Sequence, residues 1–390
     1  MYNIKNISNI YIIDNLNNFL YLRGTKRVFI MSTDISTRFV IEKVKKSRVS
    51  EVDFDTLTFG TVFTDHMFEC DYIDGEWQQP TIRPYQPIMV QPSLKVFHYG
   101  QAVFEGMKAY KDDTDQVWMF RPEQNQARIN KSAKRLAIPE FPKEWFFEAL
   151  NRLLVLDKEW IKKGDGNVVY IRPFVFATQP EILASPSNQY KFMIILSPVK
   201  SYFRSDVSVV IAEHYSRAAD GGVGAAKAAG NYAGQFYPTN LAKEKGYQQV
   251  IWTDDTTHQY LEEAGTMNVF FRINDTLITA PTSDRILDGV TRKSVIAVAE
   301  HENIPVEVRR ITVTELVSAA KDGSLKEIFG AGTAVVISPV KSFSYAGIDY
   351  PLTKPEDSYA TFFKKRITDI QYNRVEDPFG WRYKVSENNY

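Results

Sequence analysis

The chain has 390 residues, of which 44% are hydrophobic and 24% charged, and its formal net charge is zero. This balance is typical of a soluble globular protein, and the length exceeds one ordinary core, so we expect two domains. Charge neutrality argues against a nucleic-acid surface or a polybasic membrane anchor, and no apolar run reaches the roughly 18 residues of a membrane-spanning helix. Cys70 is the only cysteine, which excludes an internal disulfide framework and a cysteine-rich metal site and favours a cytoplasmic setting.

Residues 1–45 are expected to be a poorly ordered N-terminal extension. The first thirty residues are rich in Asn and Ile. They lack the basic segment, apolar core and small-residue cleavage site of a signal peptide, and an Arg- and Ser-rich transit peptide is not supported either. An appendage that precedes a working start at Met31 is an alternative interpretation of this segment.

Apolar periodicity and Gly or Pro punctuation predict a mixed succession of helices and strands. The expected helices are 123–136, 143–162, 291–301, a helix that begins at the Thr312–Glu315 capping box and ends at Gly323, and 358–372. The expected strands are 167–178, 190–196, 207–212, 249–252, 268–273, 277–279 and 306–309, with a strand-and-turn over 326–337. We therefore expect two α/β or α+β domains, a small one at 46–196 and a large one at 206–390. A connection at 197–205 would join them, with a ligand cleft between the two.

One lysine stands in a run of small residues. Lys227 lies within Gly221–Tyr232, where most of its neighbours are Gly or Ala. Small Gly and Ala neighbours do little to solvate an amine. Burial lowers a lysine pKa from its usual value of about 10.4, and the neutral amine that results can attack a carbonyl. A phosphate-binding P-loop is excluded because Ala226 and Ala228 replace the required Gly and Ser or Thr. A flexible loop with a solvated lysine remains the alternative for this segment alone.

Two carboxylates follow at the edge of an apolar strand, Glu262 and Glu263. A carboxylate beside a pyridine nitrogen keeps that nitrogen protonated and makes the ring an electron sink. Strand alternation places the two side chains on opposite faces, so only one of them can lie beside a pyridine nitrogen.

Two segments could bind an anion. Gly289–Thr291 precedes a predicted helix, whose first N–H groups suit a phosphate, and Gly330–Ala334 offers a turn with a hydroxyl. Each could equally be an ordinary cap or turn. Neither is a dinucleotide fingerprint, since Val335 occupies the position of the third small residue. A lysine, an acid and phosphate cradles in one chain together suggest pyridoxal phosphate.

At this point the chain resembles the branched-chain amino-acid aminotransferases, which have the pyridoxal-phosphate fold called type IV. The blocks that carry the resemblance lie in the family's order over roughly residues 45 to 375: Phe63–Met67, His98–Tyr99, Phe104–Tyr110, Phe120–Pro122, Tyr170–Pro173, Gly221–Tyr232, Glu263–Asn268, Gly289–Ser294 and Gly330–Ala334. The resemblance implies a smaller N-terminal α/β domain and a larger C-terminal domain, with pyridoxal 5′-phosphate in the cleft between them. Some vertebrate members carry a Cys-x-x-Cys pair where this chain has Val335 and Ser338, so a thiol switch is not available here.

The resemblance also implies roles for individual residues. Lys227 would hold the cofactor as an internal aldimine and move the proton during catalysis. Glu263 would pair with the pyridine nitrogen, leaving Glu262 as a solvated neighbour, and Tyr232 would bind the phenolic oxygen. The remaining implied cofactor contacts are Arg128, Thr266, Val290, Thr291 and Thr333. The implied substrate pocket consists of Phe59, Tyr99, Phe104, Tyr170, Arg172, Thr333 and Ala334.

The implied activity is transfer of the amino group of L-leucine, L-isoleucine or L-valine to 2-oxoglutarate, in a homodimer without a metal ion. A D-amino-acid aminotransferase or an aminodeoxychorismate lyase of the same fold is the nearest alternative. A catalytically silent relative that acts as an interaction protein is an alternative from another class.

Overall fold

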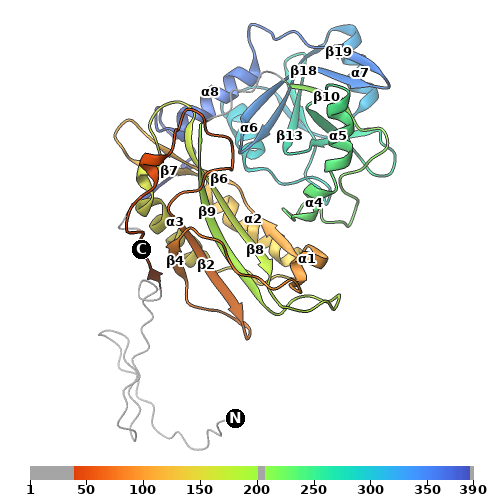
Figure 1. Cartoon of the computed structure of the whole chain (residues 1–390). Helices are drawn as coiled ribbons and strands as arrows, with labels where there is room; N and C mark the ends of the chain where they lie inside the picture. The colour runs from red at the N-terminus through yellow and green to blue at the C-terminus, as the bar shows by residue number, and fades with distance from the viewer. Residues whose placement is uncertain (1–38, 201–206, 387–390) are drawn as a thin grey trace, which may run out of the picture.

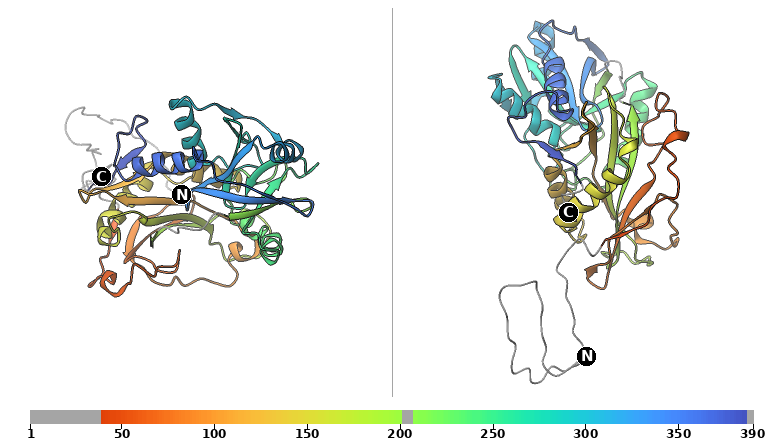
Figure 2. Two further views of the ribbon diagram at one scale, coloured as in Figure 1. Left: turned by 90° about the horizontal axis from the view of Figure 1, so that it is seen from above. Right: turned by 90° about the vertical axis from the view of Figure 1, so that its left-hand side faces the viewer.

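The computed structural model describes residues 39–200 and 207–386, which form two lobes, each built on a sheet of ten strands (Figure 1). The first lobe is coloured mainly red to yellow-green and the second green to blue, except that the blue C-terminal strand Arg382–Lys384 lies in the first lobe (Figure 2). None of the described helices is long and apolar enough to cross a membrane. The pairing of the strands therefore defines two lobes, and the strand near the C-terminus, β20 (Arg382–Lys384), returns to the sheet of the first lobe.

The first sheet has the order β1-β4-β2-β9-β8-β6-β7-β20, with β3 beside β2 and β5 beside β8. Its strands are β1 (Val40–Ile41), β2 (His66–Ile73), β3 (Glu76–Trp77), β4 (Thr81–Pro84), β5 (Ala102–Phe104), β6 (Met107–Lys111), β7 (Val117–Phe120), β8 (Asn167–Ala177), β9 (Tyr190–Lys200) and β20 (Arg382–Lys384). Only β1 and β4 pair in parallel; the other pairs are antiparallel. Side chains of α2 (Pro122–Arg135) and α3 (Lys143–Leu156) share one apolar core with this sheet.

The second sheet closes on itself, because β13 pairs with β12 as well as with β14 and β17. Its strands are β10 (Val207–Ile211), β11 (Gln249–Thr253), β12 (Tyr260–Ala264), β13 (Met267–Ile273), β14 (Thr276–Thr279), β15 (Val306–Val308), β16 (Ile311–Thr312), β17 (Leu325–Gly332), β18 (Val336–Tyr345) and β19 (Ile348–Pro351). The remaining helices are α1 (Lys95–Tyr99), α4 (Gly230–Ala233), α5 (Phe236–Glu244), α6 (Val290–His301), α7 (Val313–Asp322) and α8 (Tyr359–Gln371), with short 3₁₀ turns at Val49–Glu51 and Lys158–Trp160.

The structure differs from the sequence-based expectation at several element ends. Val40–Ile41 pairs with Thr81–Ile82, so the end of the expected N-terminal extension is ordered; residues 1–38 lie outside the described residues. The helix expected over 143–162 ends at Leu156. The reason is a long-range contact: the buried Asp157 carboxylate accepts hydrogen bonds from the backbone N of His66 at 3.0 Å and from its Nδ1 at 2.6 Å.

Two strands also depart from expectation near the lobe boundary. β9 continues to Lys200 by pairing with β8, so Ser197–Lys200 belongs to the first sheet rather than to a connection. Residues 201–205 of the expected connection lie outside the described part of the chain. The segment 326–337 is divided between β17 and β18 by a turn at 333–335. The domain limits 46–196, 197–205 and 206–390 stay a prediction.

Candidate active site

Lys227 lies on the loop between β10 and α4, at the boundary with the first lobe. Its backbone N–H donates to Ser132 Oγ at 2.9 Å, and its carbonyl accepts from the backbone N–H of Phe104 at 3.1 Å. The Lys227 amine donates to Tyr232 Oη at 2.9 Å. Burial, together with the nearby Arg128 cation, lowers the pKa of Lys227. With a lowered pKa, a larger fraction of the amine is neutral and nucleophilic at a given pH, as the sequence analysis expected.

Glu263 is the carboxylate that faces this amine. Its side chain is buried, and it accepts from Asn268 Nδ2 at 3.0 Å and from the backbone N–H of Leu287 at 3.2 Å. Arg217 Nη2 lies 2.6 Å from Glu263 Oε1. Burial raises the pKa of the Glu263 carboxyl, and the Arg217 cation opposes that rise. Glu263 is therefore held in place by three partners, and its charge depends on Arg217.

Glu262 points the other way along β12, as strand alternation requires. The expectation that it is solvated is wrong, because Glu262 is 6% exposed and its Oε1 lies 2.5 Å from Arg285 Nε. Burial raises the pKa of the Glu262 carboxyl, with Arg285 acting in the opposite direction. A buried carboxylate needs such a cationic partner, which no local sequence pattern indicates.

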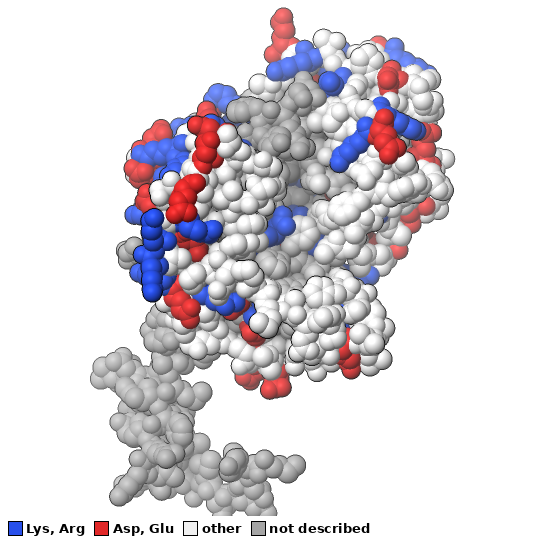
Figure 3. Space-filling view, in the orientation of Figure 1, with Lys and Arg blue, Asp and Glu red and all other residues white. Residues whose placement is uncertain are grey.

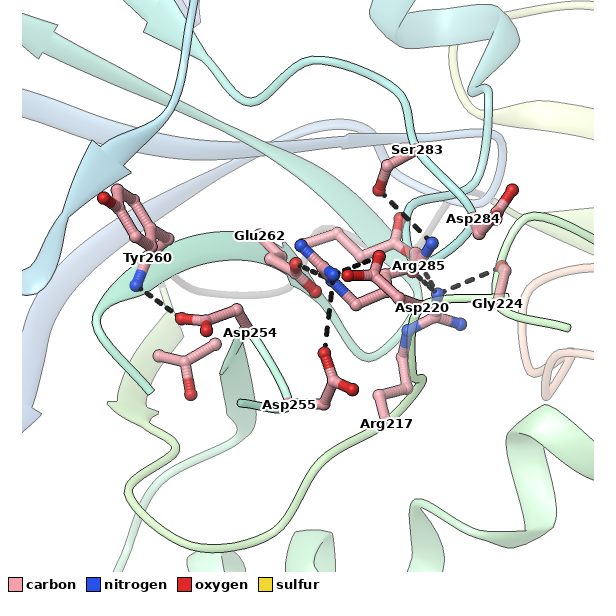
Figure 4. Close-up of polar contacts among 12 residues, drawn as sticks. Arg217, Asp220, Gly224, Asp254, Asp255, Tyr260, Glu262, Ser283, Asp284 and Arg285 are labelled. Atoms are coloured by element: carbon pink, nitrogen blue, oxygen red, sulfur yellow. Dashed lines mark hydrogen bonds and ion pairs between the residues drawn. The ribbon is translucent and has the colours of Figure 1, made fainter. Parts of the chain in front are cut away.

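Figure 4 shows how Arg285 and Arg217 fix the lysine-bearing loop. Arg285 also pairs with Asp220 and, at 3.4 Å, with Asp255. Arg217 donates to the carbonyl of Gly224 at 3.1 Å and to that of Arg285. The loop that carries Lys227 is thus tied to the strand that carries the two glutamates.

Arg128 projects from α2 toward the same region and is bound by a buried acid. Its Nε lies 2.6 Å from Glu105 Oε1 and its Nη2 2.9 Å from Oε2, while Nη1 donates to the carbonyl of Asp288 at 3.0 Å. Burial acts to raise the pKa of Glu105, but the Arg128 guanidinium outweighs it and holds that pKa below its usual range. The bidentate pair fixes the direction of the guanidinium.

The N-terminus of α6 forms a candidate anion site. The first N–H groups of a helix have no intrahelical acceptor, and here they belong to the buried residues Val290 and Thr291. A Cβ on Gly289 would lie 1.9 Å from Asn268 Oδ1, so only glycine allows this approach. Asn268 also binds Glu263, so the same amide positions the anion site and the acid.

The predicted cofactor residues line one pocket of about 50 Å³. They are Arg128, Lys227, Tyr232, Glu263, Thr266, Val290, Thr291 and Thr333. A neighbouring cavity of about 660 Å³ shares four of these lining residues, Lys227, Tyr232, Thr266 and Thr333. In the space-filling view the surface is hollowed between the two lobes, and Lys or Arg side chains lie in the hollow (Figure 3).

The larger cavity has aromatic walls and one guanidinium. Phe59 packs edge-on against Tyr170 with ring centroids 4.9 Å apart, and the Arg172 guanidinium lies 4.7 Å from the centre of the Phe104 ring. Arg172 Nη2 donates to Tyr170 Oη at 3.3 Å, whereas its buried Nε has no hydrogen-bond partner among the described residues. A buried donor without a partner can bind an anionic group of a ligand. Ala334 also lines this cavity, as predicted.

Tyr99 is the exception among the predicted pocket residues. It ends α1, is 45% exposed, and donates its hydroxyl to the carbonyl of Ile182 rather than lining the cavity. Tyr99 therefore does not line this cavity in the single chain, and its place in the substrate pocket stays a prediction. An aromatic residue beside a glycine turn is as compatible with an exposed helix end as with a pocket wall.

Comparison with known proteins identifies the family. The model of amino-transferase class IV matches residues 102–343. The chain is 44% identical over 339 residues to branched-chain-amino-acid aminotransferase 2 of Bacillus subtilis (strain 168). The match covers 86% of this chain and 93% of the relative. The chain belongs to the class IV aminotransferases. It is also 39% identical over 338 residues to the branched-chain-amino-acid aminotransferase of Mycolicibacterium smegmatis, with 84% of this chain and 92% of the relative covered.

Solved structures show that this aminotransferase has the expected fold type IV. The branched-chain aminotransferase of Thermoproteus uzoniensis, solved with norvaline, matches with a TM-score of 0.68 and 23% identity, over 82% of this chain and 100% of that one. The Escherichia coli enzyme matches with a TM-score of 0.66 and 24% identity over the same shares. The predicted two-domain architecture and the family resemblance are confirmed.

Pyridoxal 5′-phosphate is the cofactor of this family, and the residues present fit it. A lysine of lowered pKa, a buried carboxylate and the N-terminus of a helix line one pocket. The chemistry of this donor set matches an aldehyde, a pyridine nitrogen and a phosphate, respectively. Within 39–200 and 207–386, no group of three or more His, Cys, Asp or Glu side chains is placed to hold a metal ion.

Sequence reasoning missed several residues of this site. Arg217, Glu105 and Asn268 each bind a predicted site residue, but they lie 46, 23 and 5 residues away from it in the chain. Asn268 was visible as part of the Glu263–Asn268 block, and Glu105 as part of the Phe104–Tyr110 block. Arg217 had no local signal.

Proposed function

We propose that this aminotransferase moves the amino group of L-leucine, L-isoleucine or L-valine to 2-oxoglutarate, giving the branched 2-oxo acid and L-glutamate. The observation that carries the proposal is the cavity of about 660 Å³ beside Lys227, which combines aromatic walls with Arg172. Burial against Phe59, Phe104 and Tyr170 stabilises a branched apolar chain. Arg172 can meet the second carboxylate of glutamate, so one cavity accepts both kinds of substrate. The names of the relatives agree with this specificity.

When bound, the cofactor supplies an aldehyde that takes up the amino group and a ring that accepts electron density. Lys227 acts as the base that removes the proton from the substrate α-carbon and as the acid that delivers it to C4′ of the cofactor. Glu263 keeps the pyridine nitrogen protonated. Tyr232 donates to the phenolic oxygen; burial, then the Glu263 charge, raises the pKa of Tyr232 to about 12 and keeps its proton in place.

The phosphate is held by the start of α6 and by cationic and hydroxyl groups around it. The backbone N–H groups of Val290 and Thr291 supply the helix N-terminus, and Thr333 supplies a hydroxyl. Arg128 adds a fixed positive charge, oriented by Glu105, while Thr266 closes the pocket on the side of β12 and β13. Support for these roles comes from their common position around one pocket.

The assignment of Lys227 is tested by borohydride reduction of the purified enzyme. Peptide mass spectrometry should find the reduced cofactor on Lys227, and Lys227→Ala should abolish turnover of L-leucine. Glu263→Gln should lower kcat by orders of magnitude with the cofactor still bound. Glu262→Gln is the matched control, which should reduce stability more than rate because Glu262 pairs with Arg285. A larger rate loss from Glu262→Gln would reverse the two roles.

A panel of amino donors tests the substrate class. L-Leucine, L-isoleucine and L-valine should react, and D-alanine should not. Turnover of D-alanine at the rate of L-leucine would favour a D-amino-acid aminotransferase, which no named relative supports.

We also propose that the enzyme is a cytoplasmic homodimer. The hydrogen bond from Tyr99 to Ile182 joins α1 to a neighbouring loop. Large apolar side chains are exposed on both segments: Met89, Val90, Phe97, Tyr99, Ile182 and Leu183. An exposed apolar surface of this kind favours a protein interface. In a dimer, Tyr99 could complete the cavity of the partner subunit. Sedimentation equilibrium tests this, and a monomer at micromolar concentration would contradict it.

A further inference from the structure

Helix α2 of the first lobe and the start of α6 in the second lobe meet beside the candidate anion site. Arg128 on α2 donates from Nη1 to the carbonyl of Asp288 at 3.0 Å, just before α6 begins at Val290. Arg121, the N-cap residue of α2, donates from Nη1 to Ser294 Oγ at 2.9 Å. The two arginines therefore hold α6 at two points, one before its first turn and one after it.

Ser294 connects Arg121 to the first residue of α6. The Ser294 hydroxyl accepts from Arg121 and donates to the carbonyl of Val290 at 2.9 Å. The backbone N–H of Val290 is one of the donors proposed for the cofactor phosphate, and Val290 lines the cofactor pocket, whereas Arg121 and Ser294 lie outside its lining. Any effect of Arg121 on the phosphate must therefore pass through the position of α6.

The backbone conformation of Arg121 is unusual and is fixed by the returning C-terminal segment. Arg121 has φ 50°, in the left-handed region, although the following Pro122 favours an extended conformation for the residue before it. Such a conformation persists only where surrounding contacts fix it. Here the backbone N–H of Arg121 donates to the carbonyl of Trp381 at 2.8 Å, and its guanidinium lies 4.6 Å from the centre of the Trp381 ring. These contacts offset the strain and leave the guanidinium directed at α6.

Trp381 is itself held firmly in the structure. It is buried, stacks on Phe379 with ring centroids 4.0 Å apart, and meets Phe120 edge-on at 5.5 Å. The strand β20 follows directly and pairs with β7 in the first sheet. The C-terminal segment thus fixes Arg121 on the side of the first lobe, and Ser294 binds it on the side of the second.

We propose that Arg121 is a positioning residue for the cofactor phosphate, and that through Ser294 it holds the first turn of α6 in the orientation in which the N–H groups of Val290 and Thr291 bind that phosphate. The inference rests on the proposed function, in which the start of α6 is the phosphate site. It adds a residue outside the pocket, and a contact between the two lobes, on which the affinity for the phosphate depends.

The test compares two ligands that differ only in the phosphate group, pyridoxal 5′-phosphate and pyridoxal. Full-length holoenzyme is dialysed to equilibrium against graded concentrations of each, and the ratio of the two dissociation constants reports the phosphate site alone. Arg121→Met should weaken pyridoxal 5′-phosphate binding about tenfold, roughly the loss of one charge-assisted hydrogen bond, and leave pyridoxal binding unchanged.

Ser294→Ala is a second variant that leaves the strained backbone at Arg121 untouched. It should change the ratio as Arg121→Met does, and the double variant should be no weaker than either single one, because both remove the same contact. Gln124→Ala is the matched control: Gln124 also joins the two helices, by accepting from Lys293 Nζ at 3.0 Å, but this contact does not involve Val290. It should leave both affinities unchanged.

Val290→Pro tests the proposed function separately. Proline suits the first position of a helix but has no N–H, so this variant should weaken pyridoxal 5′-phosphate binding and spare pyridoxal. An unchanged ratio with Val290→Pro would show that α6 is not the phosphate site, and the proposed function of this helix would fail together with the inference.

The inference alone is overturned if Val290→Pro changes the ratio but Arg121→Met and Ser294→Ala do not. It is also overturned if these two variants weaken pyridoxal as much as pyridoxal 5′-phosphate, since that would mean a general loss of structure. Equal effects of Gln124→Ala and Ser294→Ala would likewise contradict it, because any contact between the two helices would then serve.

Discussion

Arg217 and Glu263 form a buried ion pair, with Nη2 and Oε1 2.6 Å apart, on the side of the pocket that faces Lys227. Burial raises the pKa of Glu263, and Arg217 opposes this, so removing Arg217 raises that pKa further. A carboxyl with a higher pKa is neutral over a wider acidic range, and a neutral Glu263 cannot stabilise a protonated ring nitrogen. We expect Arg217→Met to lower kcat about 10- to 100-fold, or roughly 1.4 to 2.7 kcal/mol. We also expect the acidic limb of the pH–rate profile to move to higher pH.

The control for this prediction is the other arginine of the network. Arg285→Met removes the partner of Glu262, on the opposite face of β12, and should lower stability with little movement of the pH–rate profile. Arg217→Lys should restore part of the rate, because it returns the charge without the planar guanidinium. Equal shifts from Arg217→Met and Arg285→Met would contradict a specific action of Arg217 on Glu263.

Gly106 lets the Tyr170 phenol pass close to the backbone between β5 and β6. A Cβ on Gly106 would lie 2.0 Å from Tyr170 Oη and 2.9 Å from Cζ, so Gly106→Ala must displace the phenol. Since Tyr170 contacts both Phe59 and Arg172, we expect the KM for L-leucine to rise about tenfold, with a loss of about 1 to 3 kcal/mol in stability.

Steady-state kinetics and urea unfolding measure these two effects. Gly234→Ala is the matched control, because the nearest atom to its Cβ is the carbonyl oxygen of Gly230 at an ordinary 3.8 Å. If Gly106→Ala and Gly234→Ala have the same KM for L-leucine, the position of Tyr170 does not depend on its close contact with Gly106.

Local patterns predicted those parts of the site that depend on neighbours in the chain. Alternation along one strand placed Glu262 and Glu263 on opposite faces, and the structure confirms this. The small-residue run around Lys227 indicated a lowered pKa, which the structure also confirms. Both conclusions need only the backbone period and the chemistry of adjacent side chains.

Contacts between distant segments could not be predicted in this way. Arg285, 23 residues from Glu262, turns an expected solvated carboxylate into a buried ion pair. Asp157 ends a helix because of a hydrogen bond to His66, 91 residues away. Tyr99, at the end of α1, donates its hydroxyl to the carbonyl of Ile182, 83 residues away, and does not line the cavity in the single chain. Each difference arises from tertiary packing that one sequence does not encode locally.

The predicted capping box at the start of α7 is present in part, because Thr312 is the N-cap while the Glu315 carboxylate accepts from Arg309. Thr312 Oγ1 accepts from the backbone N–H of Glu315 at 3.0 Å, as the sequence pattern predicts. Thr312→Ala should cost about 1 kcal/mol, within a range of roughly 0.5 to 2 kcal/mol for lost N-caps. Urea unfolding measures it, with Thr314→Ala on the exposed side of the same helix as the control. Equal losses from the two variants would mean that the cap contributes little.

Cys70 gives a prediction for alkaline pH. Its thiol is 1% exposed and donates to the carbonyl of Gln78 at 3.2 Å, and burial, then the Asp71 charge, raises the pKa of Cys70 to about 12. In the unfolded chain the thiol pKa is about 8.5. The contribution of the Cys70 thiol to the free energy of unfolding is therefore constant below about pH 8.5. Above that pH the unfolded chain releases the thiol proton, whereas the folded protein keeps it. Its contribution falls by about 1.4 kcal/mol per pH unit toward the folded pKa.

Cys70→Ala removes this proton and should flatten the decline of stability with pH. Urea unfolding at pH 7, 9 and 10 compares the two proteins: the variant should be less stable at pH 7, because a buried sulfur is lost, and the gap should narrow as pH rises. Tyrosines with raised pKa values act equally in both proteins, so the difference between the two curves isolates the thiol. Parallel curves from pH 7 to 10 would mean that the Cys70 pKa is not raised in the fold. Iodoacetamide provides a second readout, since native Cys70 should react far more slowly than the unfolded thiol at pH 8.5.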